Sequence, residues 1–516
     1  MSSAAILLKN QQVLVLGLGA SGLAMARWCA RQGALVTVAD TRENPPNLKA
    51  LQTLVPAASF LFSALDESLL AGRNIDHVFV SPGLSPSSYA TLFIANNSSN
   101  LTAKGELSLF NSALADLKAT EGYAPQVIAV TGTNGKTTVT SLTGQLIERA
   151  GKSAAVAGNI GPSLLDTLSE RIDNNTLPDV WVIELSSFQL HAADGFEPSV
   201  ATVLNVTQDH LDWHGTMQAY VAAKARVFGA SGLMVLNRDD AAVMAMLPAS
   251  PSPINGKERK TKERTPPRDH ITFGGGMPTR PGDFGIEDLN GMAWLVRAQD
   301  AEGTRRKRNE APEDLHIQRL MPADALRIRG RHNAVNALTA LALASAVGCV
   351  LAPLLYGLRD YRGEPHRVES IGTVNAVEFF DDSKGTNVGA TIAALNGLGA
   401  ERKLVVILGG DGKGQDFTTL AEPVFKFART AVLIGRDAPQ LRAALASTGI
   451  PLLDAASMAQ AVDMASLAAL AGDAVLMSPA CASFDMFDNY SHRAAVFFDA
   501  VKALAHSAGL VLEGRS

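Results

Sequence analysis

The chain has 516 residues, of which 47% are apolar and 18% charged, a composition typical of a soluble α/β enzyme with about three domains. Its formal net charge of −5 gives no overall basic surface, so nucleic acid is not an expected partner. The three cysteines lie far apart and form no CxxC pair, so neither a disulfide framework nor a structural zinc site is indicated. The N-terminal apolar run is too short to cross a membrane and lacks a charged segment before it, which predicts a cytoplasmic protein.

The first region, residues 1–103, begins with an expected strand over 13–16, a glycine-rich turn and an amphipathic helix. A second strand, 34–39, ends at Asp40, near the acidic position of a dinucleotide-binding βαβ unit. The turn has the spacing G-x-G-x-x-G, formed by Gly17, Gly19 and Gly22. This pattern leaves two ligands open, a nicotinamide dinucleotide or a substrate that carries a nucleotide.

Residues 127–138, VIAVTGTNGKTT, are the most informative stretch of the chain. A short apolar run ends at Gly132, and a segment of helical character follows over 138–150. This order of strand, glycine loop, Lys-Thr and helix is typical of a site for a nucleotide triphosphate. In such a site the loop N–H groups face the phosphates, Lys136 would reach the β- and γ-oxygens, and Thr137 would ligate Mg²⁺. The glycine spacing is shorter than in the usual P-loop, so an incidental glycine turn is the alternative. With ATP bound here, a nucleotide-bearing substrate is the better ligand for the first region.

The second region, residues 104–362, alternates expected strands with helical stretches, which predicts a parallel, doubly wound sheet. A polar insertion at about 249–320 interrupts it. Two runs in this insertion, 258–269 and 302–314, are rich in Lys, Arg, Glu and Pro and are interpreted as solvated loops, with a basic partner-binding patch as the alternative. The strands are expected over 127–131, 180–186, 200–206 and 233–237.

The third region, residues 363–516, repeats the βαβ pattern, with strands expected over 376–380, 403–408, 430–434 and 474–477. The prediction is therefore an α/β protein of three domains in series. The N-terminal and C-terminal domains are expected to be Rossmann-like, and the central one to be a P-loop-type ATP-binding domain with a parallel sheet.

Polar side chains follow the central strands where a parallel sheet binds ligands. Glu184 follows a buried strand, and a carboxylate beside a phosphate loop predicts a Mg²⁺ ligand, with a surface acid as the alternative. His210 follows the next strand and is expected in the same crevice. Tyr220 and Lys224 come next at helical spacing on one face, and Lys224 taken alone is interpreted as a solvent-facing lysine.

The third region has polar loops at successive strand ends, over 381–387, 409–413 and 478–485. Lys384 and Lys413 lie in the first and second of these loops. These cations are expected to meet phosphate and a substrate carboxylate. Ordinary turn chemistry is the alternative, and it accounts for one such loop more easily than for several in succession.

With these motifs together, the chain resembles the Mur ligase family. GTNGKTT is common to that family and to the folylpolyglutamate ligases, and the narrower resemblance rests on DSKGTN at 382–387, LGGDGK at 408–413 and SPACASFD at 478–485. The resemblance covers nearly the whole chain and is thin over the insertion. Gly385 stands where the family commonly has alanine, and Arg493 is followed by alanine where the family commonly has glycine.

The resemblance implies an ATP-dependent ligase that adds D-glutamate to UDP-N-acetylmuramoyl-L-alanine, a step of peptidoglycan precursor synthesis. It implies ATP and two Mg²⁺ ions as cofactors, small molecules as the partners and a monomer in the cytoplasm. The alternatives are a sister ligase for another amino acid or for folate, a nicotinamide dehydrogenase built on the first glycine turn, and an ATPase without ligase chemistry.

The resemblance also implies roles for individual residues. Catalysis would rest on Lys136, His210, Lys224 and Lys384. The nucleotide of the substrate would contact Ala20, Ser21, Asp40, Thr41, Arg42 and Gly83, and its sugar–lactyl part Asn159 and Gln189. ATP would contact Gly132, Thr133, Asn134, Gly135, Lys136, Thr137, Thr138, Asn333, Arg367 and Asp382. One Mg²⁺ would be held by Thr137 and Glu184, and the other by His210 and Lys224, which is carbamylated in the family. D-Glutamate would contact Thr386, Lys413, Ser483, Phe484 and Tyr490.

Overall fold

The computed structural model forms two compact units, which are described separately. Unit 1 comprises residues 1–206, 210–272 and 340–354, and unit 2 comprises residues 207–209, 273–339 and 355–516. The structure describes residues 6–90, 101–159, 161–193, 195–248, 268–300, 315–400 and 402–512.

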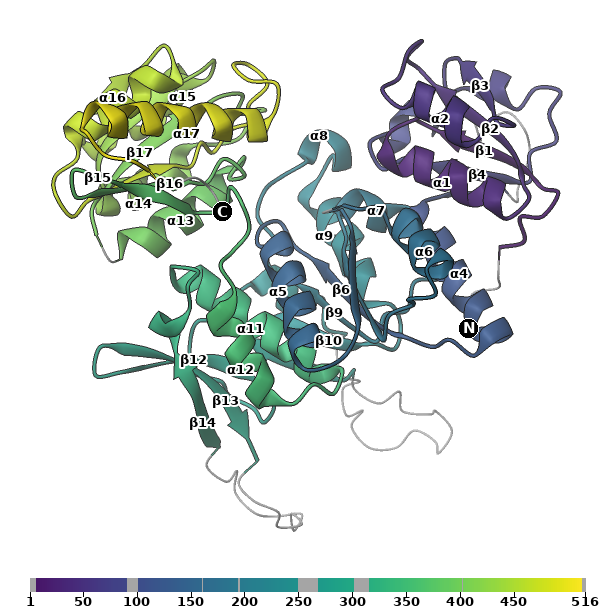
Figure 1. Cartoon of the computed structure of the whole chain (residues 1–516), viewed down its shortest axis with the longest axis horizontal. Coiled ribbons are helices and arrows are strands. Elements are labelled where there is room, and N and C mark those ends of the chain that lie inside the picture. The colour runs from purple at the N-terminus through teal and green to yellow at the C-terminus, as the bar shows by residue number, and fades with distance from the viewer. Residues whose placement is uncertain are drawn as a thin grey trace, which may run out of the picture. The chain divides into compact units, whose positions relative to one another are not determined.

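Unit 1 contains a five-stranded sheet with the order β3-β2-β1-β4-β5. Its pairs are parallel, and α1 packs on β1, β2 and β4 (Figure 1). The chain crosses from β2 and β3 on one side of β1 to β4 on the other, so ligands are expected at the carboxyl ends of β1 and β4. The elements are β1 (Gln12–Leu16), α1 (Ala20–Arg31), β2 (Leu35–Asp40), α2 (Leu48–Leu54), β3 (Ser59–Phe62), β4 (His77–Val80) and β5 (Ala103–Lys104).

The second sheet of unit 1 has six strands in the order β11-β10-β9-β6-β8-β7. β6 is central, pairs in parallel with β8 and β9, and is buried along all but its first residue. The strands are β6 (Gln126–Thr131), β7 (Ala154–Gly158), β8 (Val180–Glu184), β9 (Val200–Val203), β10 (Leu233–Asn237) and β11 (His270–Phe273). The helices are α4 (Glu106–Glu121), α5 (Lys136–Arg149), α6 (Leu164–Asp173), α7 (Ser187–His191), α8 (Leu211–His214), α9 (Met217–Ala225) and α10 (Ala241–Met244).

A three-stranded antiparallel sheet of β12 (Phe284–Leu289), β13 (Met292–Gln299) and β14 (His316–Pro322) belongs to unit 2. Most of it lies within 249–320, where the sequence analysis expected a polar insertion and no strand. Asn290 and Gly291 join β12 to β13 with φ of 51° and 80°, the left-handed pair of a type I′ hairpin turn. Residues 249–267 and 301–314, which hold most of the two charged runs, are outside the described residues.

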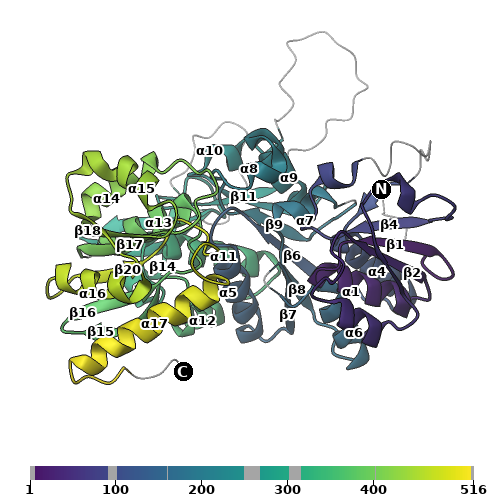
Figure 2. The same cartoon turned by 90° about the horizontal axis from the view of Figure 1, so that it is seen from above.

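The large sheet of unit 2 has the order β15-β16-β20-β17-β18-β19, parallel except for the β15–β16 hairpin. The helix α17 lies beside β15, β16 and α16 (Figure 2). The strands are β15 (Glu369–Val374), β16 (Val377–Asp381), β17 (Leu404–Gly409), β18 (Ala428–Ile434), β19 (Leu452–Asp454) and β20 (Ala474–Met477). The helices are α13 (Val388–Gly399), α14 (Ala421–Phe427), α15 (Ala438–Leu445), α16 (Met458–Ala468) and α17 (Tyr490–Ser507), while α11 (Arg331–Ala346) and α12 (Leu351–Asp360) have residues in both units.

The predicted fold class, an α/β protein with parallel sheets, is confirmed. Each strand that the sequence analysis placed has a counterpart, although β3, β5, β7, β11, β12, β13, β14, β15 and β19 were not expected. Among the described residues, no helix combines the length and the apolar character that a membrane crossing requires.

Candidate active site

The glycine turn after β1 is shaped by close backbone packing. A Cβ on Gly22 would lie 1.9 Å from the carbonyl oxygen of Gly17, so only glycine fits at this position. Ser21 at the start of α1 makes a side-chain hydrogen bond to Glu106, which is buried. Ala20, Thr41 and Gly83 lie at the carboxyl-end side of β1, β2 and β4, where the sequence analysis placed the nucleotide.

Asp40 at the end of β2 is 2% exposed and fully engaged. One carboxylate oxygen accepts the N–H of Leu18 at 2.7 Å, and Arg42 donates to both oxygens at 2.8–2.9 Å. The hydrogen bond from Arg42 lowers the pKa of Asp40 to about 2. A dinucleotide-binding fold instead offers this carboxylate to a ribose hydroxyl. The geometry therefore disfavours the dehydrogenase alternative.

The phosphate loop, residues 132–138, joins β6 to the N-terminus of α5. Gly135 precedes the helix with φ of 82°, a left-handed conformation that favours glycine. Lys136 Nζ lies over the loop and donates to the carbonyl oxygens of Gly132 at 3.0 Å and Thr133 at 2.9 Å. Asn205, after β9, accepts the N–H of Asn134 at 2.8 Å. These hydrogen bonds hold the loop and the Lys136 ammonium in place at the N-terminus of α5, where backbone N–H groups favour an anion.

Glu184 at the end of β8 is 1% exposed. Its Oε1 accepts a hydrogen bond from Asn159 Nδ2 at 2.9 Å, whereas its Oε2 is buried with no hydrogen-bond partner. A buried carboxylate oxygen without a partner is costly unless a cation meets it. The buried carboxylate of Glu184 therefore fits a hard divalent cation such as Mg²⁺.

Lys224 on α9 is 1% exposed, so the interpretation of a solvent-facing lysine is wrong. Its Nζ donates to the Gly132 carbonyl oxygen at 2.8 Å and lies 4.5 Å from the centre of the Tyr220 ring. The Tyr220 hydroxyl is 3.0 Å from the hydroxyl of Thr133. The face of α9 that carries Tyr220 and Lys224 therefore packs on the phosphate loop, which spacing alone could not reveal.

His210 precedes α8 with φ of 53°, and its ring packs edge-on against Phe188 at 4.7 Å. It follows β9, which neighbours β6 on the side away from β8, so His210 and Glu184 follow the same edge of the sheet. Gln189 is buried in α7, where its Oε1 accepts from the N–H and hydroxyl of Ser186 in a capping box. In this structure the Gln189 side-chain oxygen therefore caps the N-terminus of α7.

Asp382 follows β16 in unit 2 and is buried. Its Oδ2 accepts a hydrogen bond from Ser478 Oγ at 2.6 Å. Burial raises the pKa of Asp382 to about 7, despite this hydrogen bond. Both the neutral and the ionised form of Asp382 are therefore populated near pH 7, in the loop that also carries Lys384.

The raised pKa of Asp382 predicts that Asp382→Asn stabilises the protein at alkaline pH. The pKa of this carboxyl is about 3.9 in the unfolded chain and higher in the folded protein. The folded protein therefore loses stability relative to the unfolded chain as pH rises from about 4 to about 7. The variant should unfold at a temperature higher by roughly 3 °C or more at pH 8 and by little at pH 4.5. Thermal unfolding at both pH values checks this, and a variant less stable at pH 8 would contradict it.

Lys384 and Tyr490 contact one another in unit 2, with Lys384 Nζ 3.9 Å from the ring centre. Burial opposes ionisation of Tyr490, but the ammonium of Lys384, the hydrogen bonds with Ser491 and Lys384 and the charge of Arg367 together hold the pKa of this phenol below its usual value. Thr386 lies in the same loop and donates its N–H to the Lys384 carbonyl oxygen at 2.9 Å. Thr386 and Tyr490, two residues of the proposed glutamate site, are therefore both in contact with Lys384.

Lys413 lies in the loop after β17 with φ of 51°, and its N–H donates to Asp411 Oδ1 at 3.0 Å. Asp411 also pairs with Arg436. Ser483 is buried in the loop after β20, whereas the neighbouring Phe484 is 69% exposed. The loops after β16, β17 and β20 thus follow adjacent strands of one sheet, as the sequence analysis expected.

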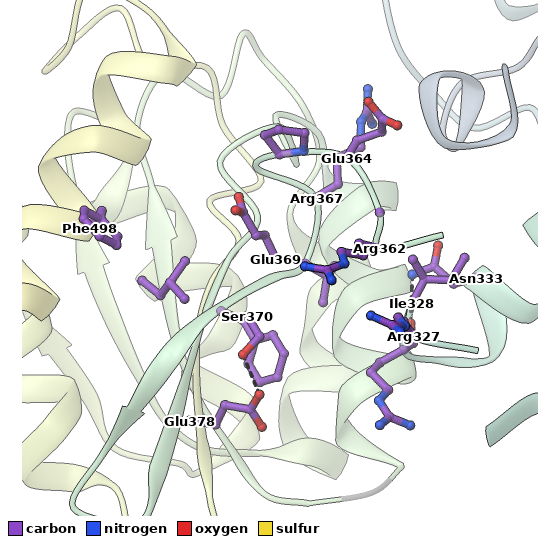
Figure 3. Close-up of a pocket in the computed structure, with 16 residues that line it drawn as sticks. Arg327, Ile328, Asn333, Arg362, Glu364, Arg367, Glu369, Ser370, Glu378 and Phe498 are labelled. Carbon is purple, nitrogen blue, oxygen red and sulfur yellow. Dashed lines mark hydrogen bonds between the residues drawn. The ribbon is translucent and has the colours of Figure 1, made fainter. Parts of the chain in front are cut away.

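A cavity of about 550 Å³ in unit 2 has Asn333 and Arg367 in its wall (Figure 3). Arg327, Arg329 and Arg362 also line it, as do Glu364, Glu369 and Glu378, so its wall carries charges of both signs. Asn333 Nδ2 donates to the Arg329 carbonyl oxygen at 2.8 Å. The two expected nucleotide contacts therefore share one cavity, in which guanidinium groups could meet phosphate.

Two residues without an assigned role make central contacts in unit 2. Arg493 on α17 is fully buried and donates to the carbonyl oxygens of Cys481 at 3.1 Å and Ser383 at 2.7 Å, so it ties two of the polar loops together. Burial lowers the pKa of Arg493 to about 10. His366 contacts the end of β16. In the sequence, only the short motifs Arg493-Ala494 and Pro365-His366-Arg367 pointed to these two residues.

Comparison with known proteins identifies the family of this chain. The family models described as "Mur ligase MurD-like, N-terminal domain", "Mur ligase middle domain" and "Mur ligase, glutamate ligase domain" match residues 11–101, 130–264 and 366–481. The chain belongs to the Mur ligase family. A relative from Albidiferax ferrireducens, 66% identical over 98% of this chain and 99% of its own length, carries the name UDP-N-acetylmuramoylalanine--D-glutamate ligase. A relative of the same name from Paraburkholderia phymatum is 55% identical over 98% of both chains.

Solved structures show the same fold. The MurF ligase from Thermotoga maritima in complex with ADP has a TM-score of 0.55 at 16% identity and covers 98% of this chain and 99% of its own. The UDP-N-acetylmuramate-alanine ligase MurC from Thermotoga maritima has a TM-score of 0.53 at 18% identity and covers 96% of this chain and 100% of its own. The resemblance to the Mur ligase family is therefore confirmed.

Proposed function

We propose that this chain is an ATP-dependent ligase that joins D-glutamate to the alanine carboxylate of UDP-N-acetylmuramoyl-L-alanine, in the cytoplasmic synthesis of the peptidoglycan precursor. The names of the full-length relatives support this substrate pair. The observation that carries the chemistry is the phosphate loop with Lys136, which follows β6. The neighbouring strand, β8, ends in Glu184, whose buried Oε2 has no hydrogen-bond partner. We further propose a monomer.

Each region has a proposed ligand. Residues 1–103 would bind the uridine nucleotide at the turn after β1, 104–362 would bind ATP on the phosphate loop, and 363–516 would bind D-glutamate. Asn333, Arg367 and Asp382 are further proposed contacts of ATP. The glutamate contacts would be Thr386, Lys413, Ser483, Phe484 and Tyr490.

The reaction would have two chemical steps. A carboxylate oxygen of the substrate alanine attacks the γ-phosphorus of ATP, the bond to the β–γ bridging oxygen breaks, and ADP leaves. The D-glutamate amine then attacks the acyl phosphate carbon, loses a proton, and the tetrahedral intermediate expels phosphate. Lys136 would offset the charge that gathers on the γ-phosphate oxygens during transfer, and Lys384 would orient the reacting groups.

Magnesium would be held at two sites, by Thr137 and Glu184 and by His210 and a carbamylated Lys224. When bound, it would supply electrostatic stabilisation to the phosphate oxygens. Asn159 donates to Glu184 and the Gly132 carbonyl oxygen accepts from Lys224, and these contacts would orient the two proposed ligands.

The test is phosphate release from ATP and Mg²⁺ with UDP-N-acetylmuramoyl-L-alanine, with D-glutamate present or omitted and with L-glutamate as a control. Release that requires both the nucleotide substrate and D-glutamate establishes the ligase and its specificity together. Release without either substrate would identify an ATPase and overturn the proposal. Release supported by a different amino acid would identify a sister ligase.

A further inference from the structure

His366 links the segment before β15 to the end of β16 in unit 2. Its Nδ1 lies 2.7 Å from Asp381 Oδ2. The carboxylate of Asp381 is fully buried and the imidazole is 17% exposed, so this contact is sheltered from solvent. The hydrogen bond fixes the ring orientation, because a buried carboxylate accepts from a ring N–H.

The backbone around this pair is held by further hydrogen bonds. The N–H of His366 donates to Glu369 Oε2 at 2.9 Å, and its carbonyl oxygen accepts the N–H of Lys384 at 3.1 Å. The second oxygen of Asp381 accepts the N–H of Ser383 at 3.0 Å. The segment that carries Arg367 and the loop that carries Lys384 are therefore fastened to one another through His366 and Asp381.

The segment also has an unfavourable backbone conformation. His366 has φ of 64° and Val368 has φ of 51°, so Arg367 stands between two left-handed residues. A β-branched residue such as Val368 rarely adopts this conformation, which persists only where the surroundings enforce it. The hydrogen bonds of His366 hold the backbone in this conformation. The next residue, Arg367, lines the cavity described above (Figure 3).

A metal site is the other reading of these residues, because ligand atoms of His366, Glu369 and Asp381 lie within 4.8 Å of one another. Each group already has a hydrogen bond within the protein. Burial would raise the pKa of Asp381, but the hydrogen bonds from His366 and Ser383 hold it below its usual value. An ionised carboxylate that accepts hydrogen bonds from both neighbours accounts for the cluster.

We propose that the Asp381–His366 pair is a positioning device that holds Arg367 and Lys384 in the conformation that binds ATP. Neither member of the pair is proposed to touch the reacting atoms. The inference rests on the proposed function, because ATP is the ligand expected at Arg367.

The test compares His366→Asn with the wild type. Asparagine tolerates a left-handed conformation and keeps the N–H that donates to Glu369, so the change removes chiefly the ring contact with Asp381. The matched control is His492→Asn, because His492 pairs with Asp488 at 3.1 Å at the surface of the same unit. Asp381→Asn and the double variant His366→Asn, Asp381→Asn complete a cycle.

The measurements are the affinity for ATP with Mg²⁺ by calorimetry, the KM for each substrate, and thermal unfolding. We expect His366→Asn to weaken ATP binding and raise the KM for ATP by about tenfold or more, as loss of an orienting partner typically does. The KM for the UDP substrate should stay within about twofold of the wild type. The double variant should be no worse than the worse single variant, because the pair acts as a unit. His492→Asn should match the wild type.

An unchanged affinity for ATP in His366→Asn would overturn the inference, as would equal rises in every KM together with a lowered unfolding temperature. Transition metal retained in one equivalent by the wild type and absent from His366→Asn would overturn it in favour of a metal site. These outcomes are separate from a failure of the proposed function, which would appear in the wild type as no substrate-dependent phosphate release while ATP binding could still be compared.

Discussion

Lys136→Ala is expected to abolish turnover, with a fall on the order of a thousandfold or more. Lys136 Nζ is held over the phosphate loop by the carbonyl oxygens of Gly132 and Thr133, where no other group on the loop carries a positive charge. Phosphoryl transfer depends on cations placed where negative charge gathers, so alanine removes a stabilising charge that neighbouring backbone N–H groups cannot replace. Phosphate release with all substrates present is the measurement.

The matched control for this variant is Lys152→Ala. Lys152 is also a partly buried lysine of unit 1, and its Nζ also donates to a backbone carbonyl oxygen, that of Val347, at 2.6 Å. It lies after α5, at the opposite end of that helix from the loop. The control variant should keep activity near the wild-type level. Near-normal activity of Lys136→Ala would remove the assignment of this loop to ATP.

The sequence predicted the central sheet and its phosphate loop well because their signals are local. β6 is an apolar run that ends in a glycine loop with Lys-Thr, and each part of that pattern lies within a dozen residues. The β12–β13 hairpin was missed although Asn290-Gly291 is a strong hairpin signal. The sequence analysis interpreted the polar runs on both sides of it as solvated loops and did not consider this dipeptide.

Contacts between distant segments explain what the sequence could not predict. Lys224 reads as a surface lysine by composition, and it is buried because α9 packs on the phosphate loop about 90 residues earlier. His366 and Asp381 are separated by a turn and a β-hairpin, and only the pairing of β15 with β16 brings them together. Periodicity places a residue on a face, but it does not say what that face meets.

Lys224→Ala is expected to lose activity on the order of a hundredfold or more, and added short carboxylic acids are expected to restore part of it. Lys224 is buried, and its Nζ donates to the Gly132 carbonyl oxygen and lies against the Tyr220 ring beside the phosphate loop. A carbamate would retain one N–H for the Gly132 oxygen and would present two oxygens to a cation, which a hard metal ion prefers.

Restoring the activity of Lys224→Ala with carboxylic acids separates the loss of the carbamate oxygens from a loss of side-chain packing. Alanine at position 224 leaves space beside Tyr220, and acetate or propionate in that space supplies the oxygens that the carbamate would have supplied. Sodium chloride at the same ionic strength should not restore activity. The Lys136→Ala variant should not respond to the acids either, because the group that it has lost is a cation and a carboxylate cannot replace it. A Lys224→Ala variant that stays folded by thermal unfolding and gains nothing from the acids would argue against the carbamate, while leaving the ligase assignment intact.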